Sequence, residues 1–225
     1  METDNLLWYH RAMKIALMNE NSQAAKNPII YDSLKKVADT KGFEVVNYGM
    51  YTATDEAQLT YVQLGILAAT LLNSGAADFV VTGCGTGEGA TLALNSFPGV
   101  LCGHIETPLD AYTFSQINDG NAIALPFALG FGWGGDLNLQ YIFEKLWCEP
   151  SGGGYPKERV VPEQRNKKIL DVVKTITHRK LVDILPELDH ELVKGAFSGA
   201  KFQEYFFRDA KDEELKKVVK DILSK

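Results

Sequence analysis

The chain alternates between short apolar runs of strand length and longer segments in which apolar residues recur at helical spacing. Five runs have the composition of strands that are buried on both faces of a parallel sheet. These runs are residues 14–18, 43–46, 78–82, 100–104 and 121–125. Segments with helical spacing follow them at residues 33–40, 59–72, 88–95, 108–116 and 137–146. Five such β-α steps predict a parallel sheet with right-handed crossovers.

The pattern predicts an α/β fold: a three-layer α/β/α sandwich of Rossmann-like type with a five-stranded parallel sheet, followed by helices only. Residues 149–156 are too rich in Gly and Pro for regular structure. Helical spacing without strand patterns resumes at residues 163–185 and 213–223, with Pro186 interrupting it. We expect an N-terminal extension, an α/β domain, and a Gly/Pro arm with a helical C-terminal extension, at residues 1–12, 13–150 and 151–225.

Composition and charge restrict the class of function. The 225 residues are 45% hydrophobic and 23% charged, enough for one sizeable core. A formal net charge of −6 argues against nucleic acid or a membrane surface as partner, and no apolar run reaches the roughly 18 residues of a membrane helix. Residues 1–12 lack the layout of a signal peptide, so we expect a cytoplasmic protein. Three cysteines without a C-x-x-C pair predict reduced thiols.

The strongest candidate for chemistry is the stretch that contains Cys84, at the point where a predicted strand becomes a helix. Gly85, Gly87 and Gly89 follow it and remove side chains where the backbone must turn. Successive N–H groups of such a turn can point at one anion, and the helix dipole adds positive potential. The same field favours the thiolate form of a cysteine, which makes Cys84 a candidate catalytic residue.

Three interpretations of this loop compete. Gly85, Gly87 and Ala90 satisfy a relaxed dinucleotide fingerprint, but that turn belongs after the first strand of its unit and here follows the third. A cysteine phosphatase loop needs an arginine six residues after Cys84, where this chain has Ala90. The third interpretation is proton transfer, in which the thiolate removes a proton beside a carbonyl and the loop amides hold the enediolate oxygens. The dinucleotide match is weak, and nothing in the spacing opposes proton transfer. A further interpretation is that Cys84 is a small buried residue at a tight turn without a catalytic role.

The loop Cys84–Gly89 resembles the signature of the ribose-5-phosphate isomerase type B and galactose-6-phosphate isomerase family. Looser matches support it across roughly residues 13 to 165. They are Lys14-Ile-Ala, Asn47-Tyr-Gly49, Gln116-Ile-Asn-Asp-Gly-Asn121 and Gly153-Gly-Tyr-Pro-Lys-Glu-Arg-Val160. The resemblance implies aldose-ketose isomerisation of a sugar phosphate through an enediolate, without metal or cofactor.

The resemblance also implies roles for particular residues. Cys84 matches the base, and Thr86 with the amides of the loop matches the anion hole. The predicted substrate-binding residues are Glu20, Asn21, Gly85, Gly87, Glu88, Gly89, Asn118 and Arg159. Asn118 matches a residue that contacts substrate from the neighbouring subunit, which implies a homodimer, or a dimer of dimers, with a composite site.

Several positions depart from the family pattern. Ile117 stands where the family has the histidine that opens the sugar ring, and Asn21 stands where it has a histidine near phosphate. Arginines of the family fall on Ala128 and Tyr155. These departures motivate an alternative function, a non-catalytic sugar or sugar-phosphate binding protein on the same fold. A nucleotide-binding oxidoreductase is the third hypothesis.

His104 has its own set of alternatives, because Cys102, His104 and Glu106 alternate and should point to one face of a strand. They could form a metal trio. His104 also lies at the carboxyl end of its strand, where open α/β sheets bind ligands, so it could act as the acid that Ile117 cannot supply. A hydrogen-bonded histidine without a catalytic role is the remaining interpretation.

Overall fold

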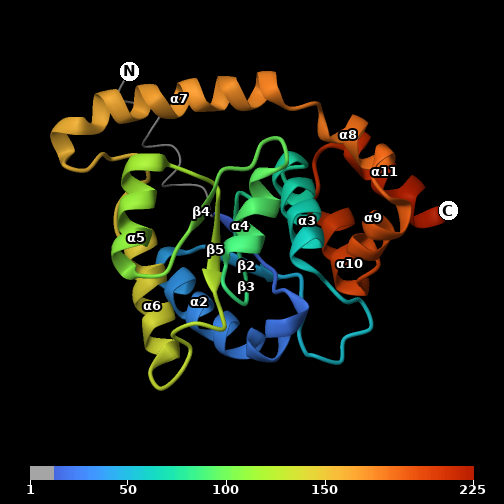
Figure 1. Ribbon diagram of the computed structural model, residues 1–225, viewed down its shortest axis with the longest axis horizontal. Helices are drawn as coiled ribbons and strands as arrows, with labels where there is room; N and C mark the ends of the chain where they lie inside the picture. Colours follow the sequence, from blue (N-terminus) through green and yellow to red (C-terminus); the bar gives the residue numbers. More distant parts are fainter. Residues whose placement is uncertain (1–12) are drawn as a thin grey trace.

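The computed structural model describes residues 13–225, so the predicted N-terminal extension at residues 1–12 lies outside the described residues. Five strands in this part of the chain form a parallel sheet in the order β2-β1-β3-β5-β4 (Figure 1). Their bounds are β1 Lys14–Leu17, β2 Glu44–Asn47, β3 Phe79–Cys84, β4 Cys102–His104 and β5 Ala122–Pro126. The predicted five-stranded parallel sheet is confirmed.

Helices cover both faces of the sheet and make it the middle layer of a sandwich. One face carries α2 Asn27–Lys41, α5 Pro108–Thr113 and α6 Gly135–Leu146, and the other carries α3 Tyr61–Asn73 and α4 Glu88–Asn95. Along β3, Phe79 and Val81 enter the first apolar core while Val80 and Cys84 enter the second. Successive side chains of a strand point to opposite faces, so one buried strand serves both cores.

Capping residues explain where the helices begin. The Thr60 hydroxyl accepts the N–H of Gln63, and the Gln63 side chain accepts the N–H of Thr60, a capping box that starts α3. Thr107 and Asp110 make the same arrangement at the start of α5. The helix predicted at residues 108–116 has two parts, because α5 passes into a π-helical segment, η3 Phe114–Asn118.

The C-terminal extension is helical, as predicted, and packs against α3. Its elements are α8 Leu181–Ile184, η5 Leu185–Glu187, α9 His190–Phe197, α10 Ala200–Asp209 and α11 Glu213–Ser224. The rings of Phe197, Phe202 and Phe206 stack in series at centroid distances of 5.3 and 5.2 Å. The Gln63 amide also donates to the Leu192 carbonyl at 3.2 Å. The extension therefore shares the core on the α3 face of the sheet.

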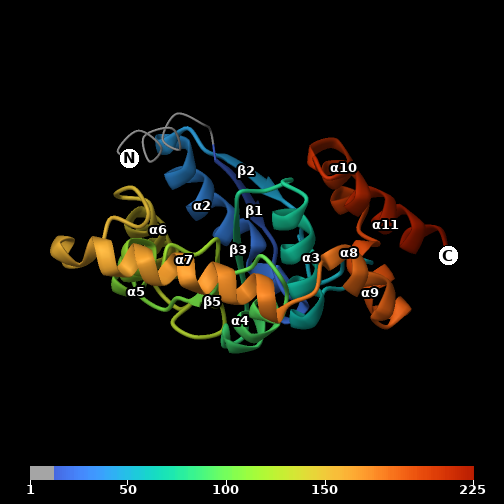
Figure 2. The same cartoon turned by 90° about the horizontal axis from the view of Figure 1, so that it is seen from above.

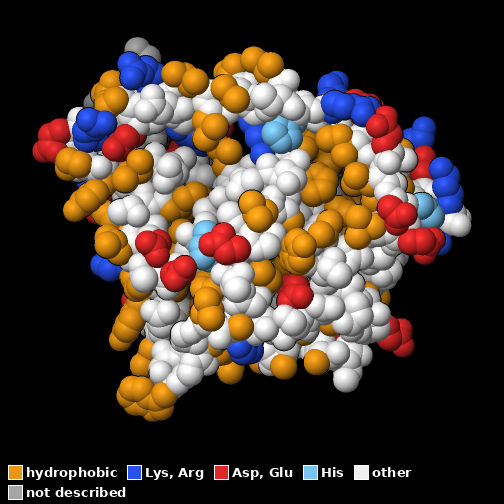
Figure 3. Space-filling view, viewed as in Figure 1, with side chains coloured by type: hydrophobic (Ala, Val, Ile, Leu, Met, Phe, Trp, Pro, Cys, Tyr) orange, Lys and Arg blue, Asp and Glu red, His pale blue; other side chains and the backbone are white. Residues whose placement is uncertain are grey.

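The helix α7 Val160–Thr177 is unlike the others, because none of its residues is buried. It ends at Thr177, earlier than predicted, since His178 adopts an extended backbone. Figures 1 and 2 show α7 running across the molecule from α5 towards α8, and hydrophobic side chains gather over it in Figure 3. Its exposed apolar side chains are Val161, Ile169, Leu170, Val172, Val173 and Ile176.

Within residues 13–225, no helix has both the length and the apolar character to cross a bilayer.

Candidate active site

Cys84 is the last residue of β3, at the carboxyl edge of the sheet. Its carbonyl accepts the N–H of Phe127 at 2.9 Å, and the carbonyl of Gly85 accepts the N–H of Ala128 at 2.9 Å. On the other side, the N–H of Glu20 donates to the carbonyl of Gly83 at 3.3 Å. The cysteine therefore lies between the loops that follow β1 and β5. Its side chain is buried but not sealed, with 7% relative exposure.

The turn after Cys84 presents unpaired donors. Within the described residues, the main-chain N–H groups of Gly85, Thr86 and Gly87 have no hydrogen-bond acceptor. The N–H of Glu88, the first residue of α4, donates to the Thr86 hydroxyl at 3.3 Å, which closes the turn. Three consecutive free N–H groups before a helix form a concave site for an anion.

Gly87 is required by both conformation and space. Its φ is +80°, a left-handed value that side chains with a Cβ rarely adopt. A Cβ at this position would lie 2.6 Å from Nε2 of His104. The close approach of an imidazole therefore depends on a glycine at this position.

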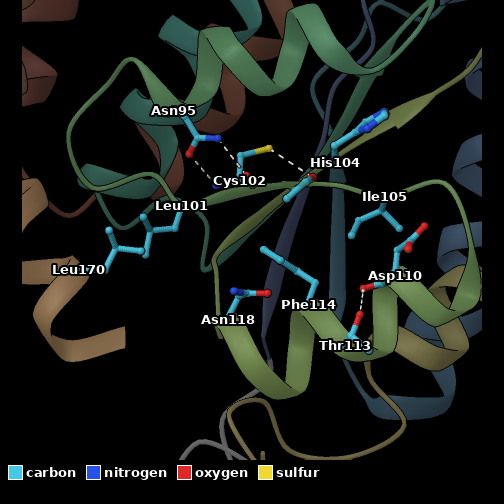
Figure 4. Close-up of a pocket in the computed structure, with 11 residues that line it drawn as sticks. Asn95, Leu101, Cys102, His104, Ile105, Asp110, Thr113, Phe114, Asn118 and Leu170 are labelled. Atoms are coloured by element: carbon cyan, nitrogen blue, oxygen red, sulfur yellow. Dashed lines mark hydrogen bonds between the residues drawn. The ribbon is translucent and has the colours of Figure 1, made fainter. Parts of the chain in front are cut away.

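His104 lies behind the glycine loop, and this placement differs from the one expected for an acid that faces substrate. Its Nε2 is 2.9 Å from the carbonyl oxygen of Thr86. Its Nδ1 lies 3.3 Å from a carboxylate oxygen of Glu88 and 3.7 Å from one of Glu106. Figure 4 shows the ring pointing away from Asn118. Both ring nitrogens are thus engaged by groups of the chain itself.

Cys102 does not take part in a metal site with His104 and Glu106. Burial raises the pKa of the Cys102 thiol to about 12, with a smaller opposing effect of the Thr91 side chain. No group of three His, Cys, Asp or Glu side chains in the described part of the chain is arranged to hold a metal ion. The metal trio considered from the sequence is therefore not formed.

Glu20 and Asn21 lie where the sequence places them, in the loop after β1. The Glu20 carboxylate caps the short helix η2 Asn21–Lys26, accepting the Ser22 N–H at 3.1 Å and the Ser22 hydroxyl at 2.6 Å. The N–H of Asn21 donates to the carbonyl of Leu59 at 2.8 Å. Glu20 thus shapes this rim of the site through its own turn.

Lys26 is a residue that sequence reasoning missed. Its Nζ donates to the carbonyl of Phe127 and, at 2.9 Å, to the side chain of Gln23, and lies 4.5 Å from the ring centroid of Phe131. An ammonium group has three N–H donors, so one remains for a ligand. The segments that follow the five strands at the carboxyl edge are residues 19–26, 48–60, 85–87, 105–107 and 127–134. Lys26 is the one Lys or Arg in these carboxyl-edge loops, so counting their charges in the sequence would have found it.

Tyr61, the first residue of α3, was also missed. Its ring carbons would lie 3.2 and 3.3 Å from a Cβ at Gly89, so the ring covers the first turn of α4. Half of the side chain remains exposed. The residues next to Tyr61 in the sequence do not indicate that its ring contacts α4, because the contact joins two different helices.

Asn118 and Arg159 lie away from Cys84 of their own chain. Asn118 ends η3, which precedes β5 and so lies towards the amino ends of the strands, whereas Cys84 lies at the carboxyl end. Asn118 lines a cavity of about 440 Å³ with Asn95, Leu101 and Leu170 (Figure 4). Arg159 is exposed in the turn η4 Lys157–Arg159 before α7. A single chain does not bring these two residues to its own cysteine.

A doubly wound α/β sandwich with a cysteine and free amides at the carboxyl edge of its sheet belongs to the class of α/β enzymes that bind small ligands at this edge. The chain belongs to the ribose/galactose isomerase family. The family profile described as "Ribose/Galactose Isomerase" matches residues 15–141, and one described as "Ribose-5-phosphate isomerase" matches residues 176–222 of the C-terminal extension.

Solved structures agree with this membership. A 4-deoxy-L-threo-5-hexosulose-uronate ketol-isomerase complexed with a tartrate is 60% identical, with a TM-score of 0.92 over 95% of this chain and 100% of that chain. A ribose-5-phosphate isomerase from Vibrio parahaemolyticus is 51% identical, with a TM-score of 0.91 over 94% of this chain and 100% of that chain. The protein is an aldose-ketose isomerase, as the glycine loop implied.

A more distant structure shares the fold alone. The type B ribose 5-phosphate isomerase of Trypanosoma brucei is 19% identical, with a TM-score of 0.61 over 72% of this chain and 99% of that chain. The ketol-isomerase and the Vibrio parahaemolyticus enzyme match 95% and 94% of this chain. The helical C-terminal extension is therefore shared with those two relatives.

Proposed function

We propose that the protein interconverts the aldose and ketose forms of a 4-deoxy-5-hexosulose uronate, with Cys84 as the base that moves a proton between C1 and C2. Support comes first from the relative that is 60% identical over 95% of the chain, a 4-deoxy-L-threo-5-hexosulose-uronate ketol-isomerase. The 51% identical relative, a ribose-5-phosphate isomerase, keeps a sugar phosphate as the second candidate. The chemistry of the site favours the uronate.

Ile117 is the observation that carries this choice. A 4-deoxy-5-hexosulose uronate has no hydroxyl on C4 and a ketone at C5, so neither position offers the hydroxyl that closes a sugar ring onto C1. Its isomerisation requires no ring-opening acid. An apolar side chain where the family resemblance places that acid agrees with such a substrate, whereas a cyclic sugar phosphate would lack its proton donor.

The charge at the site also suits a carboxylate. A phosphate carries a charge of roughly −1.5 to −2 at neutral pH and is best held by arginines, which bind it through two parallel hydrogen bonds. Ala128 and Tyr155 occupy the positions of two family arginines. Lys26, held in place by Phe127 and Gln23, offers one cation for a singly charged group.

The proposed reaction is a balanced proton transfer. The Cys84 thiolate removes the proton from C2, and the C–H electron pair forms the C1–C2 double bond while the carbonyl oxygen on C1 becomes an oxyanion. The free N–H groups of Gly85, Thr86 and Gly87 stabilise that charge. The thiol then returns the proton to C1, the proton of the C2 hydroxyl passes to the oxygen on C1, and the C2 carbonyl forms.

The proposed active form is a homodimer whose sites combine both chains. In the proposed dimer, Cys84 of one subunit faces Asn118 of the other, as the family resemblance implies. Within one chain, Asn118 lies at the opposite end of the sheet from Cys84. The face of α7 supports this assembly. Its exposed apolar side chains form a continuous helical surface of the kind that marks interaction sites in isolated chains.

Proton exchange in deuterated water tests the proposal. Wild type should incorporate deuterium at C2 of the aldose uronate and convert it to the ketose, while ribose 5-phosphate and galactose 6-phosphate react at least about 100-fold more slowly. Cys84→Ala should abolish both signals and keep the fold. Faster exchange on a sugar phosphate would transfer the assignment to that class. Binding of sugars without exchange on any of them would leave the non-catalytic binding protein.

A further inference from the structure

The position of His104 has a consequence for the main-chain groups of the glycine loop. The imidazole Nε2 lies 2.9 Å from the Thr86 carbonyl oxygen, a normal hydrogen-bond length. A carbonyl can only accept, so Nε2 carries a proton and donates it. This bond joins β4 to the turn between β3 and α4. It is thus a long-range contact at the loop in which the N–H groups of Gly85, Thr86 and Gly87 have no acceptor within residues 13–225.

The peptide bond between Thr86 and Gly87 transmits this constraint. It is trans, and in a planar trans peptide the C=O and the N–H point in opposite directions. When the Thr86 carbonyl is held towards His104, the Gly87 N–H must point to the other side of the loop. That N–H has no acceptor in the described part of the chain. The histidine therefore fixes the direction of one free donor of the proposed anion hole.

The loop and the ring are matched in shape. Gly87 has no side chain and allows the imidazole to lie against the backbone, where a Cβ would be 2.6 Å from Nε2. On its other side, Nδ1 faces the carboxylates of Glu88 and Glu106 at 3.3 and 3.7 Å. The ring has 19% relative exposure and is held from both sides, so its orientation is well defined.

We propose that His104 is a positioning residue of the isomerisation, which aims the Gly87 N–H at the substrate oxyanion by holding the Thr86 carbonyl. The inference rests on the proposed use of the loop amides as an anion hole. It gives His104 a role in the reaction without contact to substrate.

A matched pair of variants isolates the hydrogen bond. Gln and Met have similar length and volume, but only Gln can donate to the Thr86 carbonyl. His104→Met should lower kcat about 10- to 100-fold with KM within about twofold, because a misdirected donor affects the oxyanion and not the ground state. His104→Gln should recover most of the kcat. Inhibition by a hydroxamate analogue of the enediolate should weaken in His104→Met in parallel with kcat.

Controls separate this role from a structural one and from the proposed function. His178→Ala changes a partly exposed histidine that directly follows α7, and it should behave as wild type. Equal kcat in the Met and Gln variants, or a rise in KM with unchanged kcat, would overturn the positioning role. If Cys84→Ala remains active, the proposed function fails whatever His104 does. If Cys84→Ala is inactive and His104→Met retains wild-type kcat and inhibitor affinity, only the inference about His104 fails.

Discussion

Phe127 donates its main-chain N–H to the carbonyl of Cys84 at 2.9 Å. The carbonyl of the same residue accepts a hydrogen bond from the Lys26 ammonium group. One residue after β5 therefore joins the cysteine that is proposed as base to the one cation of the carboxyl-edge loops. A substrate that spans these two points would have its reacting carbons at one end and its acid group at the other.

Replacing Lys26 should weaken the binding of a substrate carboxylate. In Lys26→Met, KM for the uronate should rise about 10- to 100-fold, because a hydrogen bond to a charged group contributes about 1.5–3 kcal/mol. Steady-state kinetics with Lys26→Arg as the control, which keeps a cation, would measure this. A KM that stays at the wild-type value in Lys26→Met would show that the ammonium group only ties the loops together.

Gly87→Ala should inactivate the enzyme and destabilise it. The left-handed backbone costs about 1–2 kcal/mol for a residue with a Cβ, and the contact with His104 adds to that cost. Gly42→Ala is the matched control, since Gly42 has φ of +69° and no atom within 4 Å of a Cβ. For Gly42→Ala, chemical denaturation should show a small loss of unfolding free energy, and kcat should stay at the wild-type value. Equal effects of the two variants would contradict the role of the close approach.

Subunit complementation tests the composite site. Cys84→Ala and Asn118→Ala should each be inactive alone. When the two are refolded together, about a quarter of the wild-type activity should return, because half of the dimers are mixed and each has one intact site. Cys84→Ala refolded with the double variant Cys84→Ala, Asn118→Ala is the control and should stay inactive. Absence of recovery in the first mixture would place Asn118 outside the site.

The cysteines should differ in reactivity. Burial raises the pKa of Cys102 to about 12, so its neutral thiol is retained as the pH rises past the ordinary range of a thiol and reacts slowly. Cys148 is exposed. Iodoacetamide at about pH 8 should alkylate Cys148 and spare Cys102 in the folded protein, and label both in urea, as read by peptide mass spectrometry. Equal labelling in the folded protein would contradict the raised pKa of the Cys102 thiol.

The order of elements was predictable because burial leaves a local pattern. Strands buried on both faces read as short apolar runs, and amphipathic helices repeat every three or four residues. The helix predicted at residues 88–95 has the observed bounds of α4. The predicted helix at residues 163–185 failed at its end, because the extended backbone at His178 follows no Gly or Pro signal. The glycine loop after Cys84 was visible for the same local reason as α4.

The sequence by itself determined the α/β alternation, the turn after Cys84 and the family, since each is written in neighbouring residues. Only the tertiary structure decided that Lys26 reaches Phe127, that His104 lies behind Thr86, and that Asn118 is remote from its own cysteine. These relations depend on the strand order β2-β1-β3-β5-β4, which brings β5 beside β3 and leaves β4 at the edge. No local period encodes that order, because it is set by how whole elements share two cores.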